Sequence, residues 1–169
     1  DTTNPTNNTV TRQLDFSSGQ NGVAVASENE WYKAAYYDGS GGYFSYPTQS
    51  DSITTADANY NNSVGTVTDV GTYAGDGSHY GTFDQGGNVN EWNDAIVSTS
   101  GRGLRGGSFF DLSFLLQSSF RFSDDPFNEG DRIGFRVTSL APIPEPSAYA
   151  AILGCLGLGL ALTRRKGRA

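Results

Sequence analysis

The sequence predicts an α+β fold with one short helix, several short strands and long loops between them. Glycine supplies 22 of the 169 residues, which favours turns and opposes a helical bundle. A capping box ahead of apolar residues at helical spacing predicts the helix. Short apolar runs that alternate with turn residues in the second half of the chain predict the strands.

The helix is expected over residues 28–37. The Ser27 hydroxyl can accept a hydrogen bond from the Glu30 amide while the Glu30 carboxylate reaches back to the Ser27 amide. Asp38-Gly39 then ends the helix. The expected buried face has the spacing i, i+3, i+4 and consists of Trp31, Ala34 and Ala35.

Loops and short strands make up the rest of the predicted domain. Residues 38–82 are rich in Gly, Tyr, Asn and Asp, and so long a loop stretch in a compact domain needs an organiser, either functional or ionic. Asp124-Asp125 is expected as a solvated turn rather than a catalytic carboxylate pair, because adjacent side chains on an extended segment point apart. Three apolar runs are expected as strands: Val89–Trp92, Leu104–Phe110 and Ile133–Val137.

Charge and composition exclude several classes of protein. Residues 1–146 hold seven basic and all 18 acidic residues, a net charge of −11, which argues against nucleic acid as a partner. The chain has one Cys and one His, so it forms neither a disulfide framework nor a zinc site of four Cys or of two Cys and two His. His79 lies among Gly and Ser and is expected as an exposed loop histidine, with a ligand role as the alternative.

The C-terminus changes character abruptly. Residues 141–146 form a stiff Pro-rich linker, and residues 147–163 carry no charge before a basic cluster follows. At 1.5 Å per residue this apolar segment gives roughly 25 Å of helix, the short limit for crossing a bilayer. We therefore expect a C-terminal transmembrane helix, with the basic tail in the cytoplasm and the acidic body outside. A buried core helix is the alternative.

The tail, residues 147–169 with the tripeptide before them, resembles the PEP-CTERM sorting signal of Gram-negative bacteria. The resemblance implies recognition and cleavage by an exosortase, in a strain whose exopolysaccharide is a candidate partner. It also implies a protein of the cell envelope or extracellular space that spans the membrane once before processing. The residues that match the signal are Pro144, Glu145, Pro146, Arg164, Arg165 and Lys166.

The body resembles the sulfatase-modifying factor family, whose best-known member is the formylglycine-generating enzyme. Four segments match in order: Ser27–Ala35 (SENEWYKAA), Tyr80–Trp92 (YGTFDQGGNVNEW), Leu104–Phe109 (LRGGSF) and Ile133–Val137 (IGFRV). Asn90 stands where the family usually has Trp, and Arg121 matches an intervening Arg. The resemblance implies a C-type-lectin-like fold with few regular elements, of which residues 25–140 form the C-terminal half. The N-terminal half has no counterpart, so residues 1–24 are expected as the irregular start of a fragment.

The same resemblance bears on catalysis. The family's oxidase binds copper through two cysteines, and the matching positions here hold Asp111 and Leu116. These side chains cannot supply the soft thiolate ligands that copper(I) prefers, and Cys155 lies in the apolar tail. The family's iron-dependent sulfoxide synthases use histidines of a further domain, which His79 alone cannot replace. Copper and formylglycine chemistry are therefore not expected of this chain, which favours a non-catalytic role and leaves a related oxidoreductase as the alternative.

Calcium is the cofactor that the resemblance implies. One family site falls on the side chains of Asp84 and Glu91 and on the carbonyls of Gly87 and Val89. Two carboxylates with carbonyls on a Gly-rich turn suit a hard cation, and no neighbouring Lys or Arg in the sequence offsets their charge. The alternative is that both carboxylates are solvated or salt-bridged. A second family site would fall on Asn59, Tyr60, Asn62 and Val64.

Two further groups of side chains are given structural roles. A set of aromatic residues is expected to pack beneath the loops, with a carbohydrate-stacking surface as the alternative. Arg105 and Arg136 are expected to brace the final strands by hydrogen bonds. The aromatic set is Tyr36, Tyr37, Tyr43, Phe44 and Tyr46.

Two functions remain in competition. The first is an exported, non-catalytic, calcium-stabilised surface or extracellular-matrix protein. The second is an oxidoreductase related to the formylglycine-generating enzyme. The replaced cysteines favour the first function.

Overall fold

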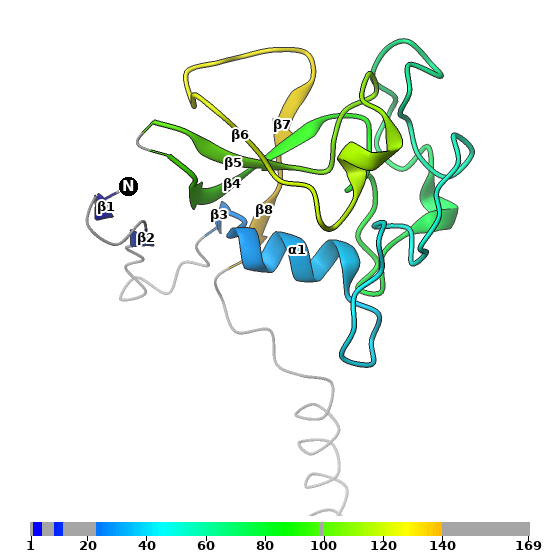
Figure 1. The fold of residues 1–169 in the computed structure, drawn as a ribbon, viewed down its shortest axis with the longest axis horizontal. Helices are drawn as coiled ribbons and strands as arrows, with labels where there is room; N and C mark the ends of the chain where they lie inside the picture. The colour runs from blue at the N-terminus through cyan, green and yellow to red at the C-terminus, as the bar shows by residue number, and fades with distance from the viewer. Residues whose placement is uncertain (1, 5–8, 12–22, 99, 140–169) are drawn as a thin grey trace, which may run out of the picture.

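The computed structural model describes residues 2–4, 9–11, 23–98 and 100–139. Figure 1 shows the helix α1 beside a small group of strands, with long loops gathered near the C-terminal end of the helix. Few regular elements of both kinds are present, so the predicted α+β class is confirmed. The elements are β1 (Thr2–Asn4), β2 (Thr9–Thr11), β3 (Val23–Val25), α1 (Glu28–Tyr36), η2 (Ala74–Asp76), β4 (Asn90–Ile96), β5 (Arg102–Arg105), η3 (Ser113–Leu116), β6 (Phe122–Asp124), β7 (Ile133–Phe135) and β8 (Val137–Ser139).

Helix α1 begins where the sequence predicts. The Ser27 hydroxyl accepts from the Glu30 amide at 3.2 Å and the Glu30 carboxylate accepts from the Ser27 amide at 2.8 Å, which confirms the capping box. The helix ends one residue before the predicted end. Its buried residues are Trp31, Ala35 and Tyr36, so the expected core position of Ala34 is wrong. Tyr36, which was not expected on this face, is buried and makes an edge contact with Trp31, with the ring centroids 5.8 Å apart.

The main sheet has the strand order β6–β5–β4–β7. β5 pairs antiparallel with both β4 and β6, whereas β7 pairs parallel with β4. The β4–β5 ladder shifts its register between Trp92 and Ile96, as at a β-bulge. β3 and β8 form a separate antiparallel pair, which brings the start and the end of the 23–139 region side by side (Figure 1).

The predicted strand at residues 104–110 is wrong beyond β5. The strand ends at Arg105, because Gly106 and Gly107 take φ values of +93° and +70°. These values lie in the left-handed region, which turns the chain away from the sheet. A side chain at Gly107 would also meet the Leu116 side chain at 2.6 Å, so a larger residue there would force Leu116 to shift.

Two other strand predictions need correction. The predicted strand at residues 133–137 is divided at Arg136, so that β7 joins the main sheet while β8 pairs with β3. Asp124, expected in a turn, is the last residue of β6, because it pairs with Arg102 of the neighbouring strand β5. Strand pairing across the sheet therefore overrides the local turn preference of Asp.

The core consists of two small clusters. The first lies at α1 and contains Ala26, Trp31, Ala35 and Tyr36. The second lies beneath the long loops and contains Tyr46, Ala58, Tyr60 and Leu116. The second cluster organises much of the loop region 38–82, for which the sequence predicted a functional or ionic organiser. Apolar packing provides part of that role.

The remaining predictions concern the two ends of the chain. The expectation that residues 1–24 are irregular is wrong for β1 and β2. These two strands pair antiparallel, because their Thr and Val residues favour extended backbone. The linker at 141–146 and the apolar segment at 147–163, with the sorting signal, lie outside the described residues. Within the described ranges, no helix is long and apolar enough to span a bilayer.

Candidate functional site

The first predicted calcium site is built around Glu91 on β4. Its side chain is 7% exposed and accepts from Arg136 at both oxygens, with Nε–Oε2 and Nη2–Oε1 distances of 2.5 and 2.6 Å. Trp31 Nε1 also donates to Oε2 at 2.5 Å. The expectation that no Lys or Arg offsets this charge is wrong, because the fold brings Arg136 onto Glu91 from 45 positions away. The predicted bracing role of Arg136 is confirmed.

The other residues of this site lie on the turn before β4. Asp84 has a φ of +58° and its Oδ2 accepts from the Gly71 amide at 2.7 Å. Gly87 has a φ of +72°, and a side chain there would meet the Asn59 carbonyl oxygen at 2.2 Å. No three Asp, Glu, His or Cys side chains come together as a metal cluster among the residues that the structure describes. Since Glu91 is already paired with Arg136, this donor set fits calcium poorly.

The second predicted calcium site contains an unpaired buried oxygen. Asn59 is 1% exposed, and its amide nitrogen donates to the Thr66 carbonyl at 2.8 Å and to Asn88 Oδ1 at 3.2 Å. Its Oδ1 has no hydrogen-bond partner. A buried amide oxygen without a donor is costly, and amide oxygens are ordinary calcium ligands. The Asn59 side chain therefore fits the predicted ion.

The other three residues of the second site occupy the loop after Asn59. Tyr60 is buried, donates its hydroxyl to the Ile53 carbonyl at 3.1 Å, and has its pKa raised, chiefly by burial. Asn62 is exposed with a φ of +54°, and Val64 is 50% exposed. These positions leave the loop open to solvent beside the buried oxygen.

The two positions of the family's copper cysteines have structural roles in this chain. Asp111 Oδ2 accepts from the amide and the hydroxyl of Ser108, both at 2.8 Å, and from Asn90 Nδ2 at 3.0 Å. Asn90 and Asp111, two of the three positions at which this chain departs from the family pattern, are thus hydrogen-bonded to one another. Leu116 is fully buried in the second core cluster. Its carbonyl accepts from the Tyr36 hydroxyl at 2.9 Å, and burial raises the pKa of that phenol.

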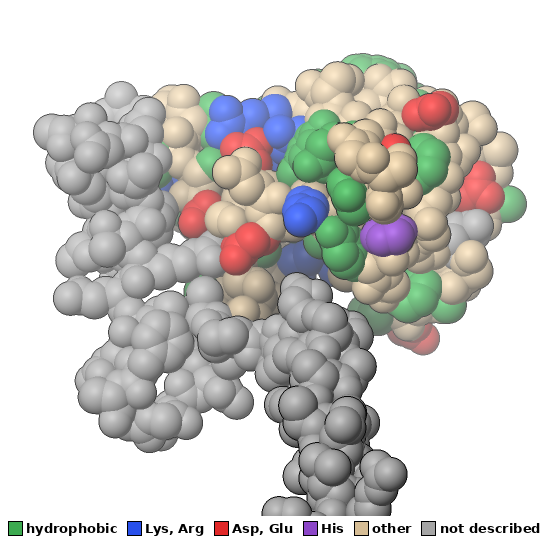
Figure 2. Space-filling view, turned by 90° about the horizontal axis from the view of Figure 1, so that it is seen from below, with side chains coloured by type: hydrophobic (Ala, Val, Ile, Leu, Met, Phe, Trp, Pro, Cys, Tyr) green, Lys and Arg blue, Asp and Glu red, His purple; other side chains and the backbone are tan. Residues whose placement is uncertain are grey.

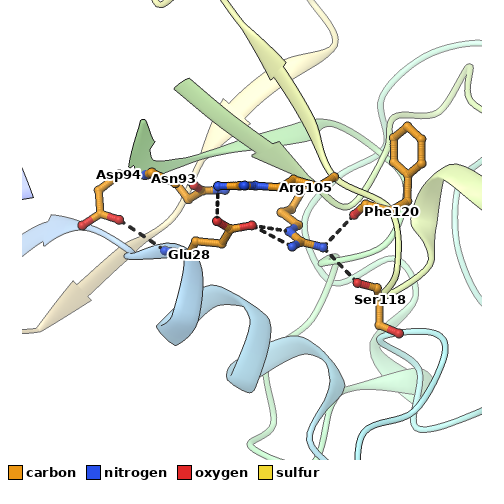
Figure 3. A network of polar contacts seen from close by, with 8 residues as sticks. Glu28, Asn93, Asp94, Arg105, Ser118 and Phe120 are labelled. Carbon is orange, nitrogen blue, oxygen red and sulfur yellow. Dashed lines mark hydrogen bonds and ion pairs between the residues drawn. The ribbon is translucent and has the colours of Figure 1, made fainter. Parts of the chain in front are cut away.

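A network of polar contacts ties α1 to the sheet and to the chain after η3 (Figure 3). Glu28 Oε1 accepts from Arg105 Nε and Nη2 at 3.0 and 2.7 Å, and Glu28 Oε2 accepts from Arg121 at 2.5 Å. Arg105 Nη1 also donates to the carbonyls of Ser118 and Phe120 at 2.9 and 2.6 Å. The predicted bracing role of Arg105 is confirmed. Sequence reasoning missed Glu28, for which the only signal is an acidic residue in the first helical turn.

The predicted aromatic set divides between core and surface. Tyr36 and Tyr46 are buried, Tyr37 and Phe44 are half-buried, and Tyr43 is 48% exposed. Packing is thus confirmed for part of the set. His79 is exposed on its loop, as predicted, and contacts the rings of Tyr37 and Tyr80. Tyr80 was not part of the predicted set.

Comparisons with known proteins agree with this fold. A profile of the sulfatase-modifying factor enzyme 1-like domain matches residues 15–140. No curated protein matches the chain in sequence. Variable protein 1 of Treponema denticola is similar in structure, with a TM-score of 0.58 and 26% identity over 69% of this chain and 47% of that chain.

Two other solved structures are also similar. PvdO from Pseudomonas aeruginosa has a TM-score of 0.55 and 24% identity over 73% of this chain and 55% of its own. CarF has a TM-score of 0.55 and 25% identity over 71% of this chain and 49% of its own. The chain therefore spans about half the length of each of these three structures.

The capped helix, the mixed sheet and the long loops tied by buried ion pairs define an α+β domain in which loops outweigh regular elements. The profile match covers most of the chain, and solved structures share the fold. The chain belongs to the sulfatase-modifying factor family.

Proposed function

We propose that this chain is part of an exported, non-catalytic binding or matrix protein of the sulfatase-modifying factor family. The observation that carries the proposal is the Asn90–Asp111 contact at 3.0 Å. At Asp111 the family's oxidase would place a copper-binding cysteine. In this chain a carboxylate holds the turn at Ser108 and takes a hydrogen bond from a second replaced residue.

The chemistry of these positions supports the same function. Copper(I) prefers soft thiolate ligands, whereas the Asp111 carboxylate is a hard ligand that already accepts three hydrogen bonds, and Leu116 is a buried aliphatic residue. At the second cysteine position, the Leu116 side chain is fully buried. It lies so close to Gly107 that a side chain there would be 2.6 Å from it. This half of the domain therefore lacks the copper ligands that conversion of a cysteine to formylglycine requires.

Calcium stabilises the module at the second predicted site. The buried, unpaired Oδ1 of Asn59 supports this part of the proposal. Tyr60, Asn62 and Val64 are the further positions of this site that the family resemblance implies. Glu91 contributes to calcium binding only if the ion displaces Arg136, so the first site is the weaker of the two.

Export and sorting rest on the tail. The Pro-Glu-Pro tripeptide, the uncharged segment and the basic cluster support processing by an exosortase and a location outside the cytoplasmic membrane. Reporter fusions test the topology. A reporter after Ala169 is expected to give a cytoplasmic signal, and a reporter after Pro142 a periplasmic one. Cytoplasmic signals from both fusions would contradict export.

The test of the non-catalytic function is a mass-spectrometric assay. The complete protein that contains this chain is incubated with a sulfatase-motif cysteine peptide, copper and oxygen. We expect no aldehyde product above a buffer control, while an active family member converts the same peptide. Aldehyde formation by this protein would establish the alternative, an oxidoreductase related to the formylglycine-generating enzyme.

A further inference from the structure

A cluster of aromatic rings lies on the surface at the C-terminal end of α1. We call it the tyrosine platform, and it consists of Lys33, Tyr37, Tyr43, His79 and Tyr80. Tyr43 and Tyr80 are 48% and 51% exposed, and His79 is exposed between the loops. Figure 2 shows the purple histidine on this face, beside green hydrophobic side chains and one blue basic group. Large exposed aromatic residues that gather in one place usually mark a binding surface.

The platform is held by the core. Trp31 and Tyr36, both fully buried, are in edge contact, and Tyr32 joins Tyr36 to Tyr43 with centroid distances of 5.0 and 5.1 Å. Tyr43 contacts Tyr37 at 5.8 Å. Tyr37 is stacked with Tyr80 at 5.8 Å and an interplanar angle of 22°. A continuous line of rings thus fixes the exposed ones, and a rigid surface loses little conformational entropy when it binds a ligand.

Two hydrogen-bonded turns present the exposed rings. In the first, the Asp38 carboxylate accepts from the amides of Ser40 and Gly42 at 2.7 and 2.9 Å. In the second, the Ser78 amide donates to the Thr82 carbonyl at 2.8 Å. The turns meet where His79 packs on Gly39, at which a side chain would lie 2.5 Å from the imidazole. The two loops therefore form one surface.

The platform carries one positively charged side chain, Lys33. Lys33 Nζ lies over the rings of Tyr37 and Tyr80, at 5.5 and 5.9 Å from their centroids. Lys33 is exposed and has no carboxylate partner within ion-pair distance among the described residues. The Asp38 carboxylate of the first turn remains charged, and its hydrogen bonds come from Ser40 and Gly42. The platform thus offers a cation on an acidic protein, next to tyrosine rings whose hydroxyl groups can donate and accept.

We propose that the tyrosine platform binds an oligosaccharide that carries carboxylate groups. The apolar face of a pyranose ring fits a flat aromatic side chain, its hydroxyls match those of tyrosine, and the ammonium of Lys33 pairs with a uronate carboxylate. An aliphatic helix or peptide would need an apolar groove, whereas the exposed residues of the platform are amphipathic. This inference rests on the proposed role as a binding module and adds the site and the ligand class.

The test is calorimetric titration of the complete protein with tetragalacturonate and with neutral cellotetraose. We expect a millimolar or tighter affinity for tetragalacturonate and at least threefold weaker binding of cellotetraose. Tyr80→Ala is expected to weaken tetragalacturonate binding by about five- to tenfold, which is typical for loss of one aromatic contact. Lys33→Gln is expected to weaken it by about threefold and to remove the preference over cellotetraose. Phe127→Ala, at a 91% exposed aromatic far along the chain, is the matched control and is expected to bind as the wild type does.

Three results would overturn the proposal: no binding of either saccharide by protein with a native circular dichroism spectrum, equal binding by Tyr80→Ala, or equal affinity for both saccharides. The formylglycine assay separates this outcome from the proposed function. Aldehyde formation overturns the non-catalytic role whatever the saccharide result. Absence of both aldehyde and saccharide binding overturns only the platform.

Discussion

Replacement of Arg136 by Met is the most direct test of what holds this domain together. Arg136 makes two hydrogen bonds to Glu91, which is 7% exposed, and one to the Phe83 carbonyl at 3.1 Å. Met fills much of the same volume but leaves the Glu91 carboxylate with Trp31 as its remaining donor. A buried charge that loses its partner destabilises a protein by about 3–5 kcal/mol. Since whole domains are stable by about 5–15 kcal/mol, the loss takes a large part of the total.

The converse substitution should cost less. In Glu91→Gln the amide oxygen can still accept from Trp31, and Arg136, whose side chain is 24% exposed, can reach water. We expect a loss of about 1–3 kcal/mol. The double variant removes both charges, so its loss should be smaller than the sum of the two single losses by at least about 1 kcal/mol.

Urea unfolding followed by circular dichroism and tryptophan fluorescence measures these free energies. Arg132→Met is the matched control, because Arg132 is 50% exposed and its ion pair with Asp131 spans 3.8 Å. Exposed pairs contribute about 0–1 kcal/mol. Equal effects of Arg136→Met and Arg132→Met, or strict additivity in the double variant, would refute the assignment of Glu91 and Arg136 as a coupled buried pair.

Three further predictions concern the turns and the ion. Gly87→Ala should lower the melting temperature more than Gly71→Ala. Both glycines have a φ near +75°, but a side chain at Gly87 would lie 2.2 Å from the Asn59 carbonyl oxygen, whereas one at Gly71 would have nothing within 4 Å. Equal melting temperatures of the two variants would contradict this. Millimolar calcium should stabilise the protein by about 1.4 kcal/mol at tenfold excess over Kd, which raises the melting temperature by a few degrees. Magnesium at the same concentration should not give this rise. Identical melting curves with calcium and with chelator would remove calcium from the proposal. The backbone amide of Ser40 holds the pKa of Asp38 below its ordinary value. This carboxylate therefore stabilises the fold above about pH 4, and its contribution is lost as the pH falls through the folded pKa. Asp38→Asn should reduce the difference in melting temperature between pH 7 and pH 3, and an unchanged difference would show that the turn does not act through its charge.

The sequence by itself determined the local features. The capping box at Ser27 and Glu30 involves residues three apart, so its geometry depends only on the helix that those residues start. The absence of cysteines at the copper positions is likewise a property of the chain alone. The family segments fixed the fold class, because their order and spacing are specific.

The strand bounds could be predicted only in part. A run of apolar residues predicts extended backbone but does not say where a strand leaves its sheet. The strand at Leu104 stops because the next two glycines adopt positive φ, and the apolar run at Ile133 divides because Arg136 turns to a buried partner. Both endings depend on contacts with residues elsewhere in the chain.

Only the tertiary structure decided which charges meet. Glu91 and Arg136 are 45 residues apart, and Glu28 lies 77 and 93 residues from its two arginines. In the sequence, Glu91 therefore looks like an uncompensated carboxylate suited to a metal ion. A carboxylate that is buried away from water requires a partner. Which residue becomes that partner depends on which segments the sheet brings together, and the separation of two residues in the sequence does not show whether they meet in the fold.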